Sequence, residues 1–261
     1  MEIPKIFNNK KLKLHKQRAV KRSGRSFLIN EVSDRLIDRI ADISRDFGSV
    51  LFIGDDGSEF IEKFKQIKHP KKITTAGILD KAEFIIENEI LPFEKQSFDL
   101  VVSIFYMHWV NDVPGVLAQI KNILKPGGIF IAYLLGDDTL FEFKEILMEV
   151  ENEISGGFSP RFSPKLDVKI LGSLLQRVGF ELPVSDSERI IASYDDIFGL
   201  VNDLRDMGET NSLHKNSKIL NKSIIKEIDS RYKSRYSDND GGILSSFDVV
   251  AITGLAAETN K

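Results

Sequence analysis

The chain has 261 residues, of which 42% are hydrophobic and 29% charged, with a formal net charge of -3 at pH 7. This balance excludes a disordered chain, and the absence of cysteine excludes disulfides, thiolate metal sites and cysteine nucleophiles. The sequence shows no apolar run of the roughly 20 residues that a membrane helix needs and no signal peptide, so we expect a cytoplasmic protein.

The first 25 residues form a basic arm. They contain nine Lys and Arg residues and one acid, which gives the arm a charge of +8 and leaves -11 for the rest of the chain. Such an arm can contact an acidic protein or peripherally bind the inner membrane, and a solvated helix face is the alternative. Because the run from Lys10 to Arg25 contains no Phe, Tyr or Trp, we expect no nucleic acid partner.

Hydrophobic periodicity predicts the elements that follow the arm. Apolar residues at three- and four-residue spacing predict a helix from Ile29 to Ile43. Short apolar runs predict strands over 50–53, 72–76, 83–86, 98–104, 129–134, 180–191 and 243–254. Helices are expected over 58–67, 116–124, 139–154 and 165–177, and an inserted helical pair over about 193–236.

Strands that alternate with helices indicate an α/β, Rossmann-like fold, a mostly parallel sheet with helices on both faces. We divide the chain into a basic arm and helix over 1–47 and an α/β domain over 48–261, which includes the insertion. In such sheets ligands bind beyond the carboxyl ends of the strands, so we expect functional residues directly after the first four strands.

Several peptides resemble known families. Leu91-Pro92-Phe93 followed by Ser97-Phe98-Asp99, and Leu124-Lys125-Pro126-Gly127-Gly128 before an apolar strand, resemble class I S-adenosylmethionine-dependent methyltransferases. More narrowly, the chain resembles the complex I assembly factor 5 family, a methyltransferase-fold group whose mitochondrial member hydroxylates an arginine of a complex I subunit. The peptides that carry this resemblance are His108-Trp109-Val110-Asn111-Asp112, Asp138-Thr139-Leu140, Gly156-Gly157-Phe158-Ser159-Pro160 and Met207-Gly208-Glu209-Thr210-Asn211. The resemblance implies a complex I subunit as protein substrate.

The resemblance also implies a site for S-adenosylmethionine, from which this sequence departs. In the family an acid ends the first strand and precedes Gly-x-Gly-x-Gly. Here Phe52 replaces the acid, Gly54 keeps its place, and Asp56 and Ser58 replace the other two glycines. An aspartate carboxylate beside the carboxylate of the cofactor would disfavour binding.

The next two strands differ in what they keep. Gly77 replaces the acid that binds the ribose hydroxyls, whereas Glu87 keeps an acid near the adenine. We therefore expect weak or no binding of S-adenosylmethionine. The residues predicted to form its site are Gly54, Asp56, Gly57, Glu87 and Ser103.

The segment after the fourth strand is predicted to carry the catalytic residues, His108 and Tyr106. A histidine with an ordinary pKa near 6.5 suits proton transfer, and a structural histidine packed beside Trp109 is the alternative. As a catalytic residue His108 should line a cleft that faces Gly54 and Gly57, roofed by the 193–236 insertion. The four histidines form no His-x-Asp or His-x-Glu pair, so no metal site is predicted.

Three functions are consistent with the sequence. Methyl transfer to a protein substrate is the leading prediction, because it requires mainly positioning of the acceptor. Arginine hydroxylation needs an oxidant that the sequence does not reveal. A non-catalytic assembly or binding protein with a decayed cofactor site needs neither.

Overall fold

A computed structural model describes residues 5–22, 27–54, 57–215 and 220–258. Its centre is a seven-stranded sheet in the order β3-β2-β1-β4-β5-β7-β6. β1 to β5 are parallel, and β7 runs antiparallel to both β5 and β6. The mostly parallel α/β fold predicted from the sequence is therefore confirmed. The strands are β1 Ser49–Ile53, β2 Lys72–Gly77, β3 Phe84–Ile85, β4 Phe98–Ile104, β5 Leu124–Leu135, β6 Glu181–Tyr194 and β7 Ile243–Leu255.

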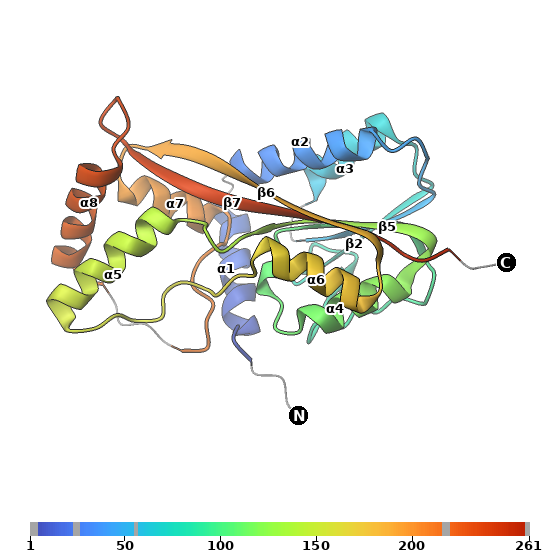
Figure 1. Ribbon diagram of the computed structural model, residues 1–261, viewed down its shortest axis with the longest axis horizontal. Helices are drawn as coiled ribbons and strands as arrows, with labels where there is room; N and C mark the ends of the chain where they lie inside the picture. The colour runs from blue at the N-terminus through green and yellow to red at the C-terminus, as the bar shows by residue number, and fades with distance from the viewer. Residues whose placement is uncertain (1–4, 23–26, 55–56, 216–219, 259–261) are drawn as a thin grey trace.

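Helices cover both faces of the sheet (Figure 1). One face carries α2 (Phe27–Ala41) and α3 (Ser58–Ile67), and the other carries α4 (Val113–Ile123) and α6 (Val168–Val178). This explains why β1 is apolar from Val50 to Ile53. Val50 and Phe52 enter the core under α2 and α3, while Leu51 and Ile53 enter the core under α4 and α6.

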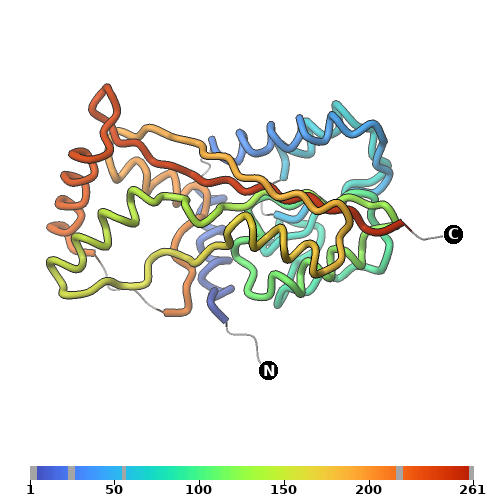
Figure 2. The backbone as a smooth tube through the Cα atoms, in the orientation of Figure 1, coloured from blue at the N-terminus to red at the C-terminus, as the bar shows by residue number. Residues whose placement is uncertain are grey.

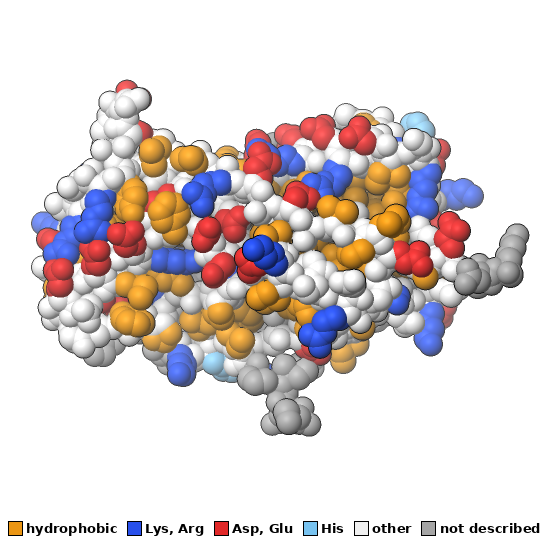
Figure 3. All heavy atoms as spheres, viewed as in Figure 1, with side chains coloured by type: hydrophobic (Ala, Val, Ile, Leu, Met, Phe, Trp, Pro, Cys, Tyr) orange, Lys and Arg blue, Asp and Glu red, His pale blue; other side chains and the backbone are white. Residues whose placement is uncertain are grey.

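β6 and β7 form a long antiparallel pair that runs along most of the molecule (Figure 2). The chain between them forms α7 (Ile197–Asp206) and α8 (Lys222–Tyr236), the expected helical insertion. α8 packs on α5 (Phe141–Ser155), where Arg231 pairs with Glu153 at 2.6 Å and Arg235 with Glu149 at 2.8 Å. Opposite charges accordingly alternate over this end of the molecule (Figure 3).

The described part of the basic arm forms α1 (Asn9–Arg22), which packs against the body and buries Leu12, Lys16 and Ala19. The chain before α1 pairs with the segment after α7, because the Asn8 N–H donates to the Ser212 carbonyl at 2.7 Å. α1 is therefore a structural element with one exposed, basic face. Glu2 and Arg25 of the arm lie outside the described residues.

Within the described ranges, no helix combines the length and the apolar character needed to cross a bilayer.

Candidate functional site

The loop between β1 and α3 was predicted to hold the cofactor, and the ring of Phe52 covers its described glycines. Phe52 is buried and stacks on Phe60, with 5.6 Å between ring centroids. A Cβ atom on Gly57 would lie 2.5 Å from the Phe52 ring, and one on Gly54 would lie 2.9 Å from it. The aromatic ring thus fills the space beside both glycines. Asp56 lies outside the described residues.

The end of β2 is closed by the same loop. The Gly54 N–H donates to the Ala76 carbonyl at 2.9 Å, which holds the loop directly on β2. A Cβ atom on Gly77 would lie 2.5 Å from the Gly54 carbonyl oxygen. Backbone cannot yield as the end of a long side chain can, so no acidic side chain fits at position 77 in this arrangement.

The two other predicted cofactor residues lie apart. Glu87 is exposed and borders a cavity of about 240 Å³ that Leu12 and Lys13 of α1 also line. This is below the roughly 300–1,000 Å³ of small-molecule sites. Ser103 is fully buried in β4, and its hydroxyl has no hydrogen-bond partner among the described residues. The described residues therefore do not fit S-adenosylmethionine as this fold ordinarily holds it.

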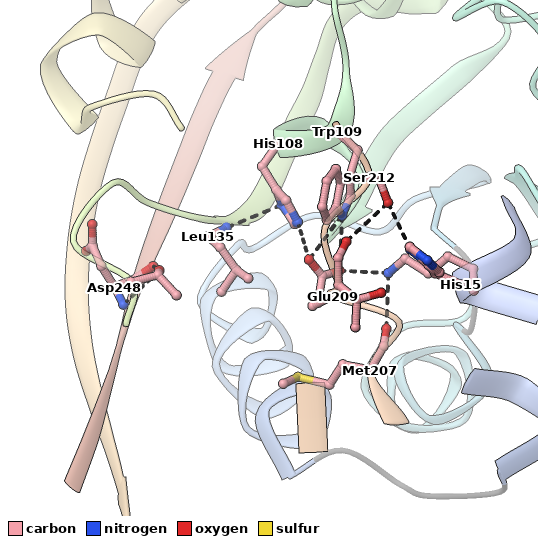
Figure 4. Close-up of polar contacts among 11 residues, drawn as sticks. His15, His108, Trp109, Leu135, Met207, Glu209, Ser212 and Asp248 are labelled. Atoms are coloured by element: carbon pink, nitrogen blue, oxygen red, sulfur yellow. Dashed lines mark hydrogen bonds and ion pairs between the residues drawn. The ribbon is translucent and has the colours of Figure 1, made fainter. Parts of the chain in front are cut away.

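His108 belongs to a buried carboxylate cluster, in which Lys16, His108 and Trp109 contact Glu209. Figure 4 shows His108 and Trp109 pointing toward Glu209. His108 Nε2 lies 2.8 Å from Glu209 Oε2, and the Leu135 N–H approaches Nδ1 at 3.4 Å. The acceptor role of Nδ1 assigns the ring proton to Nε2, which donates to Glu209. Trp109 Nε1 and Lys16 Nζ donate to the same carboxylate at 3.0 and 2.7 Å.

The charges of this cluster are set by burial and by the partners. Burial lowers the pKa of His108, and the Glu209 carboxylate opposes this shift only in part. Burial alone would raise the pKa of Glu209, but Lys16 and His108 hold it well below its usual range. The cluster is thus a neutral histidine and an ammonium group around one carboxylate.

The expectation that His108 lines a cleft is wrong. Its side chain is 1% exposed, and both ring nitrogens have partners within the fold. A general base must lie within hydrogen-bond reach of its substrate, and here both ring nitrogens of His108 are bonded within the fold. The catalytic role of His108 stays a prediction. Tyr106 does line the small cavity of about 240 Å³, and its catalytic role stays a prediction.

A larger cavity of about 820 Å³ opens beyond the end of β5. We name it the basic cavity. Its wall comes from α1, α5, α7 and the chain segments 161–165 and 209–211, and α8 contributes none of the residues below. The basic cavity is lined by His15, Arg18, Lys21, Arg22, Trp109, Leu135, Thr139, Leu140, Phe143, Lys144, Leu147, Arg161, Phe162, Ser163, Lys165, Val201, Leu204, Arg205, Glu209, Thr210, Asn211 and Leu220.

Sequence reasoning did not single out Lys165, because a helix was predicted to begin there. The helix begins instead at Val168, where the Asp167 side chain accepts from the Lys169 N–H at 2.7 Å and caps it. Lys165 thus lies in the connecting segment beside the cavity. The available signal was the family-like peptides, since Trp109, Thr139 and Glu209 come from three of them and line this wall.

Within the described ranges, no group of three or more His, Asp or Glu side chains is arranged to hold a metal ion.

Comparisons with known proteins agree with the fold. Residues 47–132 match the methyltransferase domain family. The structure of a putative methyltransferase from Bacillus halodurans aligns over 85% of this chain and 98% of its own, with a TM-score of 0.58 and 14% identity. Phosphoethanolamine N-methyltransferase 2 from Haemonchus contortus, in complex with S-adenosyl-L-methionine, aligns over 86% of this chain and 52% of its own, with a TM-score of 0.50 and 13% identity. The protein is thus a class I methyltransferase-fold protein.

Relatives that match along most of the chain identify its family within this fold class. The mitochondrial arginine-hydroxylase NDUFAF5 of Mus musculus is 36% identical over 87% of this chain and 70% of its own length. The Homo sapiens protein of the same name is 35% identical over 87% of this chain and 69% of its own length. The chain belongs to the NDUFAF5 family, as its peptides predicted.

Proposed function

We propose that the protein is an assembly factor for complex I (NADH:quinone oxidoreductase) that binds a subunit and acts on one of its arginine side chains. The observation that carries this proposal is the relation to arginine-hydroxylase NDUFAF5 along 87% of the chain. The family-like peptides that begin at His108 and at Met207 meet in the buried carboxylate cluster, and both contribute residues to the wall of the basic cavity.

S-adenosylmethionine is not expected to be the working co-substrate. Methyl transfer requires the sulfonium group to be held in line with the acceptor. The Phe52 ring and the closed end of β2 at Gly77 leave this protein without the side chains that hold the cofactor in this fold. We expect isothermal titration with S-adenosylmethionine to give weak or no binding, and a low-micromolar affinity would contradict this.

One observation favours a second candidate, a non-catalytic assembly protein. His108 is enclosed with both ring nitrogens bonded within the fold, an arrangement typical of a structural histidine. Such a protein would hold the subunit without changing it.

Mass spectrometry of the subunit decides between these functions. The subunit is produced with and without this protein, and its arginine-containing peptides are compared. A gain of one oxygen atom supports arginine hydroxylation, and a gain of a methyl group would restore the methyltransferase prediction. An unmodified subunit that still co-purifies with the protein indicates binding alone.

We also propose that the exposed basic face of α1 contacts an acidic protein surface or the inner membrane. Arg18 and Lys21 are exposed on this face. Cosedimentation with anionic vesicles should be strong at low salt and fall as salt screens these charges. The relatives are named mitochondrial, and the cytoplasmic location stays a prediction from sequence.

A further inference from the structure

The basic cavity has the size and the apolar surface of a small-molecule site. Its volume of about 820 Å³ falls within the roughly 300–1,000 Å³ of such sites. Phe143 of α5 and Phe162 of the connecting segment line it with their ring centroids 5.5 Å apart, and Leu204 of α7 lines it as well. These side chains provide apolar surface for a ligand with a hydrocarbon body.

Positive charge in this cavity exceeds what the surrounding residues neutralise. Arg18, Lys21 and Lys165 line it, and none of the three has a hydrogen bond or ion pair among the described residues. Glu209 is the one acidic residue that the described chain contributes to the wall. Its carboxylate already accepts from Lys16, His108 and Trp109, so it cannot serve the three free cations as well.

Among these cations, Lys165 is the one whose pKa is lowered most clearly. Its side chain borders the cavity and keeps intermediate exposure, yet burial and nearby Lys144 together lower the pKa of Lys165 to about 8. The carboxylates of Glu209, Asp248 and Asp137 offset this shift only in part. The two lysines differ, because Lys144 Nζ donates to the Asp137 carbonyl and lies 6.0 Å over the Phe162 ring. An ammonium group without such contacts is costly to desolvate, and an anion beside it would remove that cost.

The same charges argue against a cationic occupant. A guanidinium group entering the cavity would face Arg18, Lys21 and Lys165 with no free carboxylate to receive it. The ligand of this cavity therefore differs from the arginine side chain on which the protein is proposed to act.

We propose that the basic cavity binds an amphiphilic organic anion, with a carboxylate or phosphate head group at Lys165 and an alkyl chain against Phe143, Phe162 and Leu204. Arg18 and Lys21 lie on the exposed side of the cavity, where they would attract the head group before it enters. Binding of this ligand does not depend on the proposed function, because the residues that would hold it all belong to this chain.

Titration of the full chain with amphiphiles of one chain length tests the proposal. The probes are dodecanoate, dodecyl phosphate and the cation dodecyltrimethylammonium, each below its micelle concentration. We expect saturable binding of an anion and none of the cation. Equal binding of both charges, or no saturable binding of either anion, would overturn the proposal.

Substitutions then place the head group. Lys165→Met keeps the length of the side chain and removes its charge, and we expect it to weaken anion binding about tenfold, or about 1.4 kcal/mol. Lys169→Met is the matched control, because Lys169 is exposed on α6 and does not line the cavity. Near-ultraviolet circular dichroism checks that both variants are folded. Unchanged affinity in folded Lys165→Met contradicts the assignment.

The source of the anion is identified separately. Organic extraction of the purified protein followed by lipid mass spectrometry distinguishes a free acyl acid from a phospholipid. A polyglutamate peptide that binds while both dodecyl anions fail would show that the site takes an acidic protein segment instead. None of these measurements involves the arginine-bearing subunit, so they can fail while the arginine modification succeeds, or the reverse.

Discussion

The two halves of the carboxyl edge of the sheet have opposite character. Over β1 and β2 the edge is closed, because Phe52 fills the loop and the Gly54 carbonyl lies against Gly77. Beyond β5 the edge is open, and unpaired cations such as Lys165 line about 820 Å³. Burying an aromatic ring contributes on the order of 1.5–3 kcal/mol, whereas an unpaired cation costs stability. The closed half serves the fold, and the open half retains a cost that the proposed anion would relieve.

The largest effect is expected at Glu209, which stands at the wall of the open half and holds α1 in place. Glu209→Ala leaves Lys16 buried without its carboxylate, so unfolding in urea should show a loss of about 3–5 kcal/mol. The double variant Lys16→Met with Glu209→Met should recover part of this loss, because it removes the unpaired buried charge but leaves Trp109 Nε1 and His108 Nε2 without their acceptor. A loss below about 1 kcal/mol in Glu209→Ala would show that the cluster does not carry this region.

The closed half is broken most directly at Gly77. Gly77→Asp forces a side chain against the Gly54 carbonyl, and we expect a loss of about 3 kcal/mol of stability and no gain in S-adenosylmethionine binding. Gly157→Asp is the control, since nothing lies within 4 Å of a Cβ atom there. It should change the free energy of unfolding by less than about 0.5 kcal/mol. Tight cofactor binding by Gly77→Asp would refute the view that this half is closed.

Acid should weaken the cluster that borders the open half. Unfolded His108 gains a proton below about pH 6.5, and the folded ring resists it because its pKa is lowered. Unfolded Glu209 gains a proton near pH 4.5, and folded Glu209 stays ionised because its pKa is lowered too. The unfolded state therefore binds more protons, and stability should fall by on the order of 2 kcal/mol from pH 7 to pH 4.5.

Urea unfolding across this pH range, repeated for two variants, isolates the histidine. His108→Gln should flatten the part of the fall between pH 6.5 and pH 5, because Gln can donate to Glu209 without titrating. His69→Gln, at an exposed histidine, should leave the profile of the parent protein unchanged. Equal profiles for both variants would show that His108 is not the group that titrates.

The smallest effect is a gain of stability in the open half. Lys165→Met removes a desolvated cation, so it should raise the free energy of unfolding by about 1 kcal/mol. For a chain of this size that corresponds to a rise in Tm of roughly 2–4 °C by differential scanning calorimetry. Lys169→Met should leave Tm unchanged. A lowered Tm in Lys165→Met would mean that this ammonium group stabilises the fold.

The order of the elements could be predicted from the sequence because each strand and helix carries a local apolar period. The position of His108 could not, since its burial depends on Glu209, 101 residues further along the chain. Closure at Gly77 depends likewise on a backbone contact with Gly54 across two strands. Weak binding of S-adenosylmethionine could nevertheless be predicted from the sequence, because Phe52 and Gly77 depart from the residues that the family has at these positions.

The ion pair between Lys16 and Glu209 has a consequence for the order of events during synthesis. Its two residues are 193 positions apart, and the chain before α1 pairs with the segment that ends near His214. At ~5–20 residues per second, the first helix waits on the order of 10–40 s for its docking site to leave the ribosome. During that interval Leu12 and Ala19 have no native surface to cover them, and a chaperone that binds nascent chains would have time to act there.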